Sequence, residues 1–251
     1  MADRSCPLAS QVLLWSAIAV FVGVGARTAW RLLESAELVR RSSPLQRAPV
    51  QPSGWLLIVG DSTAVGTGAT TPSASVVGLL GRQFPDLHID NRARDGARFA
   101  DLLEQLDSDE RFDWVIVMAG GNDVVRLRRL AALQTDIERV LHRARQRADQ
   151  VVLMPAGNVG NAPFFFPPLS WVMTWRSRRL HVFTREAASH HGAVFVNLFR
   201  EAADDPFVLR PGLNARDGLH PSDAGYRVWF DELMTQAALS ERFSAALVEN
   251  R

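Results

Sequence analysis

The stretch WLLIVGDSTA, residues 55–64, decides the fold class, because a continuous apolar run turns abruptly into glycine, acid and hydroxyl residues. An uninterrupted apolar run of this kind is typical of a strand that is buried on both faces, as in a parallel sheet. The polar residues that follow place Ser62 in a tight turn directly after the strand. Since ligands of open α/β sheets bind beyond the carboxyl ends of the strands, we expect the Ser62 hydroxyl to face a ligand site.

Downstream of this stretch, strand patterns and helix patterns alternate along the chain. Strands are expected at 55–59, 87–91, 114–118, 150–154 and 193–198. Helices are expected at 73–84, 99–106, 124–148, 169–190 and 222–245. This alternation predicts an α/β fold of the flavodoxin-like kind, a doubly wound parallel sheet of about five strands with helices on both faces.

An apolar helix is expected before this domain, because residues 8–26 form an apolar run without a charge. The run is close to the ~20 residues that a helix needs to cross a bilayer. We therefore expect residues 1–41 to form a membrane anchor with a juxtamembrane helix, and the proline-containing segment 42–54 to be a linker. The alternatives are a signal peptide, cleaved near Ala26, and a helix buried in or lying on the protein.

Arginine residues are distributed unequally about the apolar run. Arg4 precedes it, whereas Arg27, Arg31, Arg40 and Arg41 follow it. The positive-inside rule then favours a catalytic domain on the cytoplasmic side of the membrane. An export signal would instead place the domain in the periplasm or outside the cell.

The composition excludes several classes of function. The formal net charge of +1 gives no reason to expect nucleic acid as a partner. The absence of lysine excludes a lysine Schiff base and a phosphate-binding loop, and a single cysteine, Cys6, excludes an intrachain disulfide. The pair Gly66 and Gly68 lacks the third glycine of a dinucleotide-binding fingerprint, and none of the six histidines has an H-E-x-x-H context. We therefore expect no cofactor and no metal site.

Three further groups of chemically active residues follow other predicted strands. Gly96 could present a bare backbone N–H to a ligand, and Asn122 carries an amide that can hold a developing oxyanion. Asp217 and His220 share a short turn, where a carboxylate can orient an imidazole that takes a proton from Ser62. Each group alone is also typical of turns, helix caps or surface pairs. Together they supply a nucleophile, a base, an orienting acid and oxyanion donors at one edge of the sheet.

These four blocks resemble, in their order, the motifs of the SGNH/GDSL hydrolase superfamily. The blocks are Gly60-Asp61-Ser62, Gly96, Gly121-Asn122-Asp123 and Asp217-Gly218-Leu219-His220-Pro221. The resemblance implies that Ser62 attacks an ester carbonyl while His220, oriented by Asp217, takes and returns the proton. It also implies an oxyanion hole made by the N–H groups of Ser62 and Gly96 and the side-chain amide of Asn122.

The resemblance makes residues 55–251 a hydrolase domain and implies a serine hydrolase that cleaves carboxylic esters. Thr63 stands where the family's name has leucine, a departure that leaves this chemistry unchanged. The superfamily includes esterases, lipases, thioesterases and carbohydrate deacetylases, and some members transfer acyl groups. Acyl transfer to a lipid or sugar acceptor therefore stays open, as does an inert binding module tethered to the membrane.

The segment NAPFFFPPLSWVMTW, residues 161–175, is informative about the class of substrate, because it is unusually apolar and follows the fourth predicted strand. Phe164, Phe165 and Phe166, together with Asp61, are candidate substrate-binding residues. The aromatic residues would form an acyl-chain groove or a surface that enters lipid; the alternative is that they pack against the core. With the expected anchor over 8–26, this favours a lipid-like or medium-chain ester. The sequence does not indicate an oligomeric state.

Overall fold

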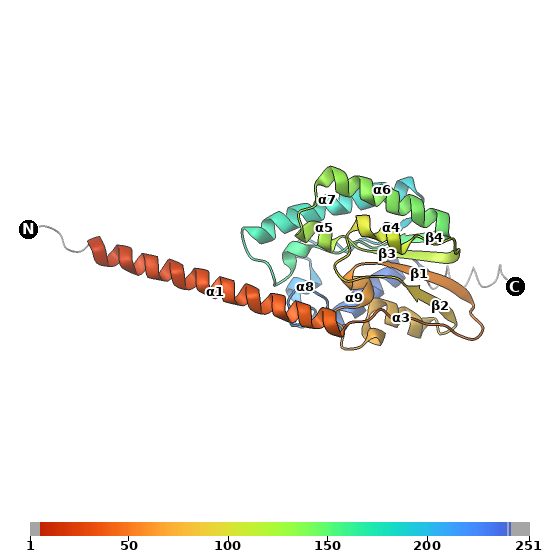
Figure 1. The fold of residues 1–251 in the computed structure, drawn as a ribbon, viewed down its shortest axis with the longest axis horizontal. Helices are drawn as coiled ribbons and strands as arrows, with labels where there is room; N and C mark the ends of the chain where they lie inside the picture. The colour runs from red at the N-terminus through yellow and green to blue at the C-terminus, as the bar shows by residue number, and fades with distance from the viewer. Residues whose placement is uncertain (1–5, 240, 242–251) are drawn as a thin grey trace, which may run out of the picture.

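The computed structural model describes residues 6–239 and 241, and these residues form a five-stranded parallel sheet covered by helices (Figure 1). The strands are β1 Gly54–Gly60, β2 Leu87–Asn91, β3 Phe112–Met118, β4 Ala148–Leu153 and β5 Val194–Phe195. They lie in the order β2-β1-β3-β4-β5, and every neighbouring pair is parallel. This is the flavodoxin-like order, so the predicted fold class is confirmed.

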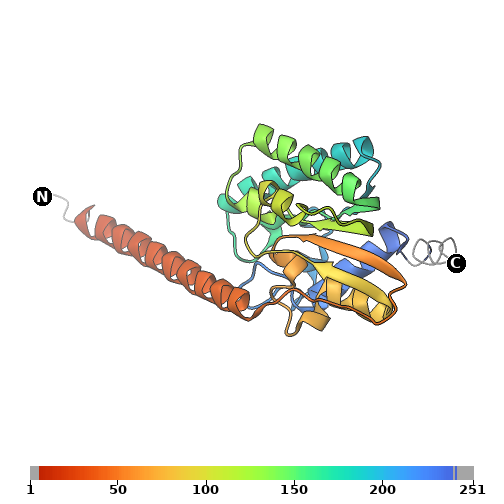
Figure 2. The same cartoon turned by 45° about the vertical axis from the view of Figure 1, so that its right-hand side comes forward.

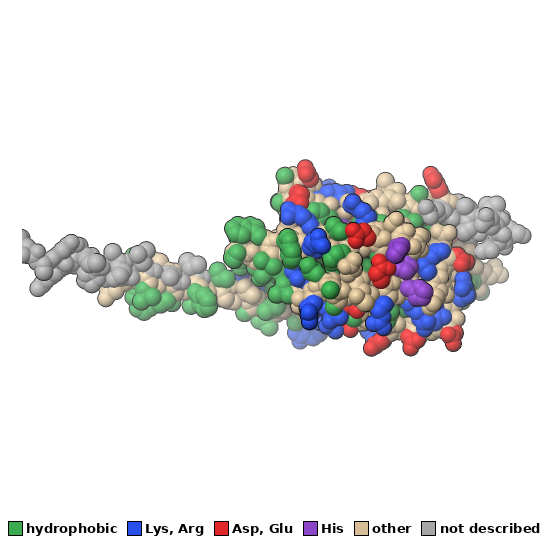
Figure 3. All heavy atoms as spheres, turned by 90° about the horizontal axis from the view of Figure 1, so that it is seen from above, with side chains coloured by type: hydrophobic (Ala, Val, Ile, Leu, Met, Phe, Trp, Pro, Cys, Tyr) green, Lys and Arg blue, Asp and Glu red, His purple; other side chains and the backbone are tan. Residues whose placement is uncertain are grey.

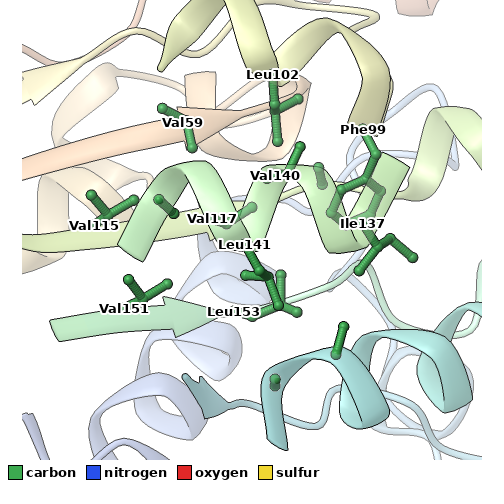
Figure 4. Close-up of a cluster of buried hydrophobic side chains, with 14 of the residues drawn as sticks. Val59, Phe99, Leu102, Val115, Val117, Ile137, Val140, Leu141, Val151 and Leu153 are labelled. Atoms are coloured by element: carbon green, nitrogen blue, oxygen red, sulfur yellow. The ribbon is translucent and has the colours of Figure 1, made fainter. Parts of the chain in front are cut away.

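Helices cover both faces of the sheet because successive strand residues point to opposite sides. Leu56 and Ile58 of β1 face one apolar cluster, whereas Leu57 and Val59 face the other (Figure 4). The first cluster is closed by α3 Val76–Gln83 and α9 Asp223–Gln236. The second is closed by α4 Leu102–Gln105, α6 Leu130–Arg147 and α7 Leu169–His190.

Short helices occupy the connections. They are α2 Ser62–Val65, α5 Gly121–Val125 and α8 Pro206–Leu209, with the 3-10 turns η1 Pro72–Ala74, η2 Phe99–Asp101 and η3 Val159–Asn161. The helix predicted over 124–148 is instead the pair α5 and α6, because Leu127 adopts φ +53°, which ends α5. The strand predicted over 193–198 is reduced to β5, and the predicted end of the last helix, 242–245, lies outside the described residues.

The N-terminal helix α1, Cys6–Arg41, confirms the predicted apolar helix and continues well beyond the apolar run. Its N-terminal half projects away from the domain and its C-terminal half lies against it (Figures 1 and 2). Within the described residues one helical stretch, Leu14–Arg41, is long and apolar enough to cross a membrane, and its apolar part is not buried in the protein. A signal sequence near the N-terminus meets the same criterion.

The segment 42–54 connects α1 to β1 and is held along the edge of β2. Arg47 and Ile89 form an antiparallel bridge with N–H···O distances of 3.0 and 2.9 Å. The side-chain amide of Gln46 donates to the carbonyl of Asn91 and accepts from its N–H. The connection from α1 to β1 is therefore held by hydrogen bonds along the outer side of β2.

Candidate active site

The end of β1 fixes the position of Ser62. A Cβ on Gly60 would lie 2.1 Å from the carbonyl oxygen of Met118, so only glycine allows β1 and β3 to approach this closely. The buried side chain of Gln105 accepts from the N–H of Gly60 at 2.7 Å and donates to its carbonyl at 2.9 Å. Sequence analysis missed Gln105, because a lone glutamine in a short helix carries no recognisable motif.

Asp61 turns the chain from β1 into α2. Its backbone is extended, and its Oδ1 accepts from the N–H of Thr63 at 2.9 Å and from the Thr63 hydroxyl at 2.8 Å. Asp61 is thus the N-cap, and Ser62 is the first residue of α2. The side chain of Asp61 also lines the pocket beside Ser62, where sequence analysis placed it.

The structure brings Ser62, His220 and Asp217 into one hydrogen-bonded chain. The Oγ of Ser62 lies 3.0 Å from Nε2 of His220, and Nδ1 of His220 lies 2.6 Å from Oδ2 of Asp217. All three residues are buried, with Asp217 fully shielded from solvent. The other carboxylate oxygen of Asp217 accepts from the N–H groups of Leu219 and His220.

These contacts decide the protonation states of the pair. Burial alone would raise the pKa of the Asp217 carboxyl, but the hydrogen bond from His220 and the two backbone N–H groups outweigh it and hold the pKa below its ordinary value. An ionised Asp217 accepts a hydrogen bond from the N–H at Nδ1 of His220. Nε2 of the neutral ring is then free to accept the proton of Ser62.

Gly68 allows the loop after α2 to lie against the turn that carries His220. A Cβ on Gly68 would be 2.4 Å from the carbonyl oxygen of Pro221 and 3.0 Å from Cβ of His220. The buried hydroxyl of Tyr226 donates to the carbonyl of Thr67 at 2.7 Å and fixes the same loop from below. Gly68 was considered in the sequence only as part of a nucleotide fingerprint, although closely spaced glycines also indicate close backbone approach.

The C-terminal half of α1 contacts the loops on both sides of this site. Nη1 of Arg31 donates to the carbonyl of Arg216 at 2.8 Å, and Glu34 forms an ion pair with the Arg216 guanidinium. The hydroxyl of Ser42 donates to the carboxylate of Asp95 at 3.2 Å. Arg216 directly precedes Asp217, and Asp95 directly precedes Gly96. The C-terminal half of α1 therefore supports the turn that carries His220, and Ser42, the residue after α1, contacts the loop that carries Gly96.

Of the three oxyanion donors expected from the sequence, two line the pocket beside His220 and one does not. Ser62 is the first residue of α2, so its N–H has no acceptor within that helix. Asn122 lines the same pocket as Ser62, and its side-chain amide is held by a hydrogen bond to the carbonyl of Ala97 at 3.1 Å. Gly96 adopts φ +75° in the loop after β2 and does not line the pocket. Only Ser62 and Asn122 are thus brought to one pocket.

A pocket of about 150 Å³ opens beside Ser62 and His220. Its apolar wall is formed by Val125, Val159, Leu198, Phe207, Val228 and Trp229. Its polar side chains are Asn158, Asn161, Arg200, Asp205, Asn214 and Glu232. Several of these polar groups are already paired: Asn161 donates to Asp205 at 2.7 Å, and Arg200 lies 3.4 Å from Glu232.

The three phenylalanines predicted to bind substrate lie outside the lining of this pocket. The N–H of Phe164 donates to the carbonyl of Gly218 at 2.9 Å, on the turn between Asp217 and His220. Phe165 packs against the apolar cluster under α6 and α7. The ring of Phe166 lies 4.6 Å from the guanidinium carbon of Arg27 in α1.

A second carboxylate, Asp123, is buried near the site. Burial raises the pKa of Asp123 to about 6, and the nearby carboxylate of Asp61 adds to this rise. The N–H of Phe99, which donates to Asp123 at 3.0 Å, acts in the opposite direction and lowers the pKa. Within the described part of the chain, no group of three or more His, Cys, Asp or Glu side chains is arranged to hold a metal ion.

Comparison with known proteins relates this chain to a described family. The sequence model of the GDSL-like Lipase/Acylhydrolase family matches residues 58–228, a range that contains the whole hydrogen-bonded chain from Ser62 to Asp217. A search of curated proteins gave no match.

Solved structures share the fold. TesA is 23% identical over 72% of this chain and 97% of its own, with a TM-score of 0.58. LAE5, described as an α/β hydrolase enzyme from the metagenome of Lake Arreo, is 20% identical over 75% and 96%, with a TM-score of 0.57. The acetylxylan esterase Axe2 from Geobacillus stearothermophilus is 22% identical over 75% and 96%, with a TM-score of 0.53.

Proposed function

Because the chain belongs to the GDSL-like lipase/acylhydrolase family, we propose that it hydrolyses carboxylic esters through an acyl-enzyme formed on Ser62. The observation that carries this proposal is the contact between Oγ of Ser62 and Nε2 of His220, at 3.0 Å. This is the distance at which a general base can take a hydroxyl proton. The short contact from His220 to Asp217 supplies the third member of a catalytic triad.

The proposed reaction has two halves. In the first, Oγ of Ser62 attacks the ester carbonyl while Nε2 of His220 takes its proton; the C–O bond then breaks, and His220 returns the proton to the leaving alcohol. In the second, water gives a proton to His220 and attacks the carbonyl of the acyl-enzyme. The bond between the acyl carbon and Oγ of Ser62 then breaks, the acid leaves, and His220 returns the proton to Oγ of Ser62. The N–H of Ser62 and the amide of Asn122 hold the oxyanion in both halves, joined by the N–H of Gly96 if its loop closes on the substrate.

The pocket supports a medium-chain or lipid-like acyl group as the part of the substrate that is bound. A volume of about 150 Å³ is that of a cavity that encloses a benzene molecule. It therefore holds an acyl chain of about four to eight carbons beside Ser62. The paired polar groups at the Arg200 end leave few free donors for a sugar.

A series of p-nitrophenyl esters from acetate to palmitate tests this proposal. We expect kcat/KM to rise with chain length to an optimum at about four to eight carbons, because each buried methylene contributes about 0.8 kcal/mol until the pocket is filled. Activity on acetate alone would contradict the acyl pocket. No activity on any ester, with no reaction towards a fluorophosphonate, would instead favour a binding module, and acyl products formed on added alcohols would identify a transferase.

We also infer that α1 anchors the enzyme in a membrane with the catalytic domain on the cytoplasmic side. The apolar run is unburied in the structure, and four arginines follow it where one precedes it. Fusion of alkaline phosphatase or a fluorescent protein to the C-terminus tests the orientation. Fluorescence without phosphatase activity is the expected result, and the reverse would place the domain outside the cytoplasm.

A further inference from the structure

The first two turns of α7 expose large apolar side chains in a small area. Leu169, Trp171, Val172 and Trp175 are 46%, 68%, 43% and 50% exposed, although the same turns bury Met173 in the core. We call these four exposed residues the α7 apolar face. Contiguous exposed apolar groups of this kind mark an interaction surface.

The α7 apolar face lies beside the end of the apolar run of α1. The loop 163–168 leads into α7, and Nη2 of Arg27 donates to the carbonyl of Pro163 at 2.8 Å. The Arg27 guanidinium also covers the ring of Phe166. Because Arg27 directly follows the apolar run, the loop that begins α7 is held at the point where α1 would leave a bilayer.

The figures show that the start of α7 lies at the end of the domain toward which α1 projects. In Figure 1, the start of α7 and the loop before it form the side of the domain nearest the projecting half of α1. In Figure 3, hydrophobic side chains gather over that same end of the domain. A bilayer crossed by α1 would therefore meet the α7 apolar face.

The active site lies on this same side. Arg31, one helical turn after Arg27, donates to the carbonyl of Arg216, next to Asp217. Helix α8, whose Phe207 lines the pocket, exposes Val208 and Leu209 by 48% and 61%. The turn that carries His220 is thus bonded to α1 within two turns of the end of the apolar run.

We infer that the α7 apolar face docks on the bilayer in which α1 is inserted, and that the pocket receives its ester substrates from that bilayer. This inference rests on the membrane anchor proposed above and names the substrate class of the proposed active site: amphiphilic esters that reside in lipid. Tryptophan side chains suit this contact, because their apolar rings enter the acyl region while their N–H groups remain at the headgroups.

Site-specific fluorescence in nanodiscs tests the docking. A single cysteine replaces Trp171, Ile18 or Asp109 in the Cys6→Ser chain and is labelled with bimane. Each labelled protein is reconstituted at one chain per nanodisc, in ordinary phosphatidylcholine or in its brominated form. Ile18 lies within the apolar run, and Asp109 lies exposed before β3, at the opposite edge of the sheet. Bromine quenches only labels that contact the acyl chains.

We expect brominated lipid to quench the labels at positions 18 and 171 and to leave the label at position 109 unchanged. Quenching at 18 without quenching at 171 would overturn the docking while the anchor stands. No quenching at 18 would overturn the anchor and the docking together. No quenching at 171, together with a shift in the emission of that label that appears only in discs with two chains, would identify a second copy as the occupant and overturn the inference.

Activity in the same discs tests the delivery of substrate. The variant Trp171→Ser/Trp175→Ser is compared with Val182→Ser, which changes an exposed apolar residue three turns further along the same face of α7. We expect the double variant to hydrolyse a long-chain ester embedded in the disc about fivefold or more slowly, because the apolar face contributes to docking, and to hydrolyse soluble p-nitrophenyl acetate at the wild-type rate. Equal loss on both esters, or no loss on either, would overturn the inference. Failure of the wild-type protein to hydrolyse p-nitrophenyl acetate would instead count against the proposed active site.

Discussion

Nη1 of Arg31, in the C-terminal half of α1, donates a hydrogen bond to the backbone carbonyl of Arg216 at 2.8 Å. The two residues are far apart in the chain, and Arg216 directly precedes the buried Asp217 that orients His220. A Cβ on Gly218 would lie 2.2 Å from the same Nη1 atom, so the guanidinium lies flat against the turn that carries the base. The N-terminal helix therefore supports the turn that carries His220.

Replacing Arg31 by alanine should lower kcat on a soluble ester by on the order of tenfold, with little change in KM. The physical reason is that a base displaced by a fraction of an ångström loses proton-transfer geometry, whereas the acyl pocket does not contain Arg31. Steady-state kinetics on p-nitrophenyl butyrate measures both constants. Arg40→Ala is the matched control, because Arg40 lies on the same helix with an exposed side chain. Equal effects of the two substitutions would show that the Arg31 contact does not position the base.

Substitution of Asp217 should leave more residual activity than substitution of His220. Asp217→Asn should reduce kcat by on the order of 10⁴ and His220→Ala by on the order of 10⁶, because the asparagine leaves an imidazole in place but in the wrong tautomer. Rates with an activated ester, normalised to the Ser62→Ala background, measure the difference. Equal losses would mean that Asp217 is not the orienting acid.

Truncating Asn122 to alanine should lower kcat by about 10²–10³ and leave KM nearly unchanged, since an oxyanion donor acts mainly in the transition state. Its amide is held by the carbonyl of Ala97, so the asparagine is positioned before substrate binds. The same kinetic assay measures the loss, with circular dichroism confirming the fold. A change confined to KM would show that Asn122 binds substrate without stabilising the oxyanion.

Asp123→Asn should stabilise the domain above pH 6 and have no effect near pH 4. The folded-state pKa of Asp123 is raised to about 6 by burial, so the folded chain holds a proton that the unfolded chain releases near pH 4. The contribution of Asp123 to wild-type stability therefore falls as pH rises from about 4 to about 6, by up to about 3 kcal/mol, and stays lower above that range. The amide oxygen of asparagine still accepts the Phe99 N–H.

Thermal unfolding at pH 4 and pH 8 measures this difference, with the exposed Asp109→Asn as the control. A stabilisation by Asp123→Asn that is the same at both pH values would contradict the raised pKa.

The sequence was sufficient for the sheet, since strands buried on both faces leave continuous apolar runs such as Leu56–Val59 in WLLIV, and the chain folds them in the expected order. It also singled out Ser62, Asp217 and His220, and the structure places these three residues in one hydrogen-bonded chain. Support from elsewhere in the chain was not predictable: Gln105, Tyr226 and Arg31 act through one or two long-range hydrogen bonds each, which leave no local pattern.

Two local features also required the structure. The break between α5 and α6 depends on a positive φ at Leu127, a residue that does not favour it. The position of Phe166 depends on α1, because its ring packs under Arg27 rather than in the pocket. Aromatic content alone therefore could not distinguish an acyl pocket from a contact with α1.

The central claim is that Ser62 is the nucleophile, and intact-protein mass spectrometry after reaction with a fluorophosphonate tests it most directly. We expect one adduct per chain, mapped by peptide sequencing to Ser62, with adduct formation and ester hydrolysis lost together in Ser62→Ala. An adduct on another residue, or undiminished ester hydrolysis by Ser62→Ala, would contradict the account.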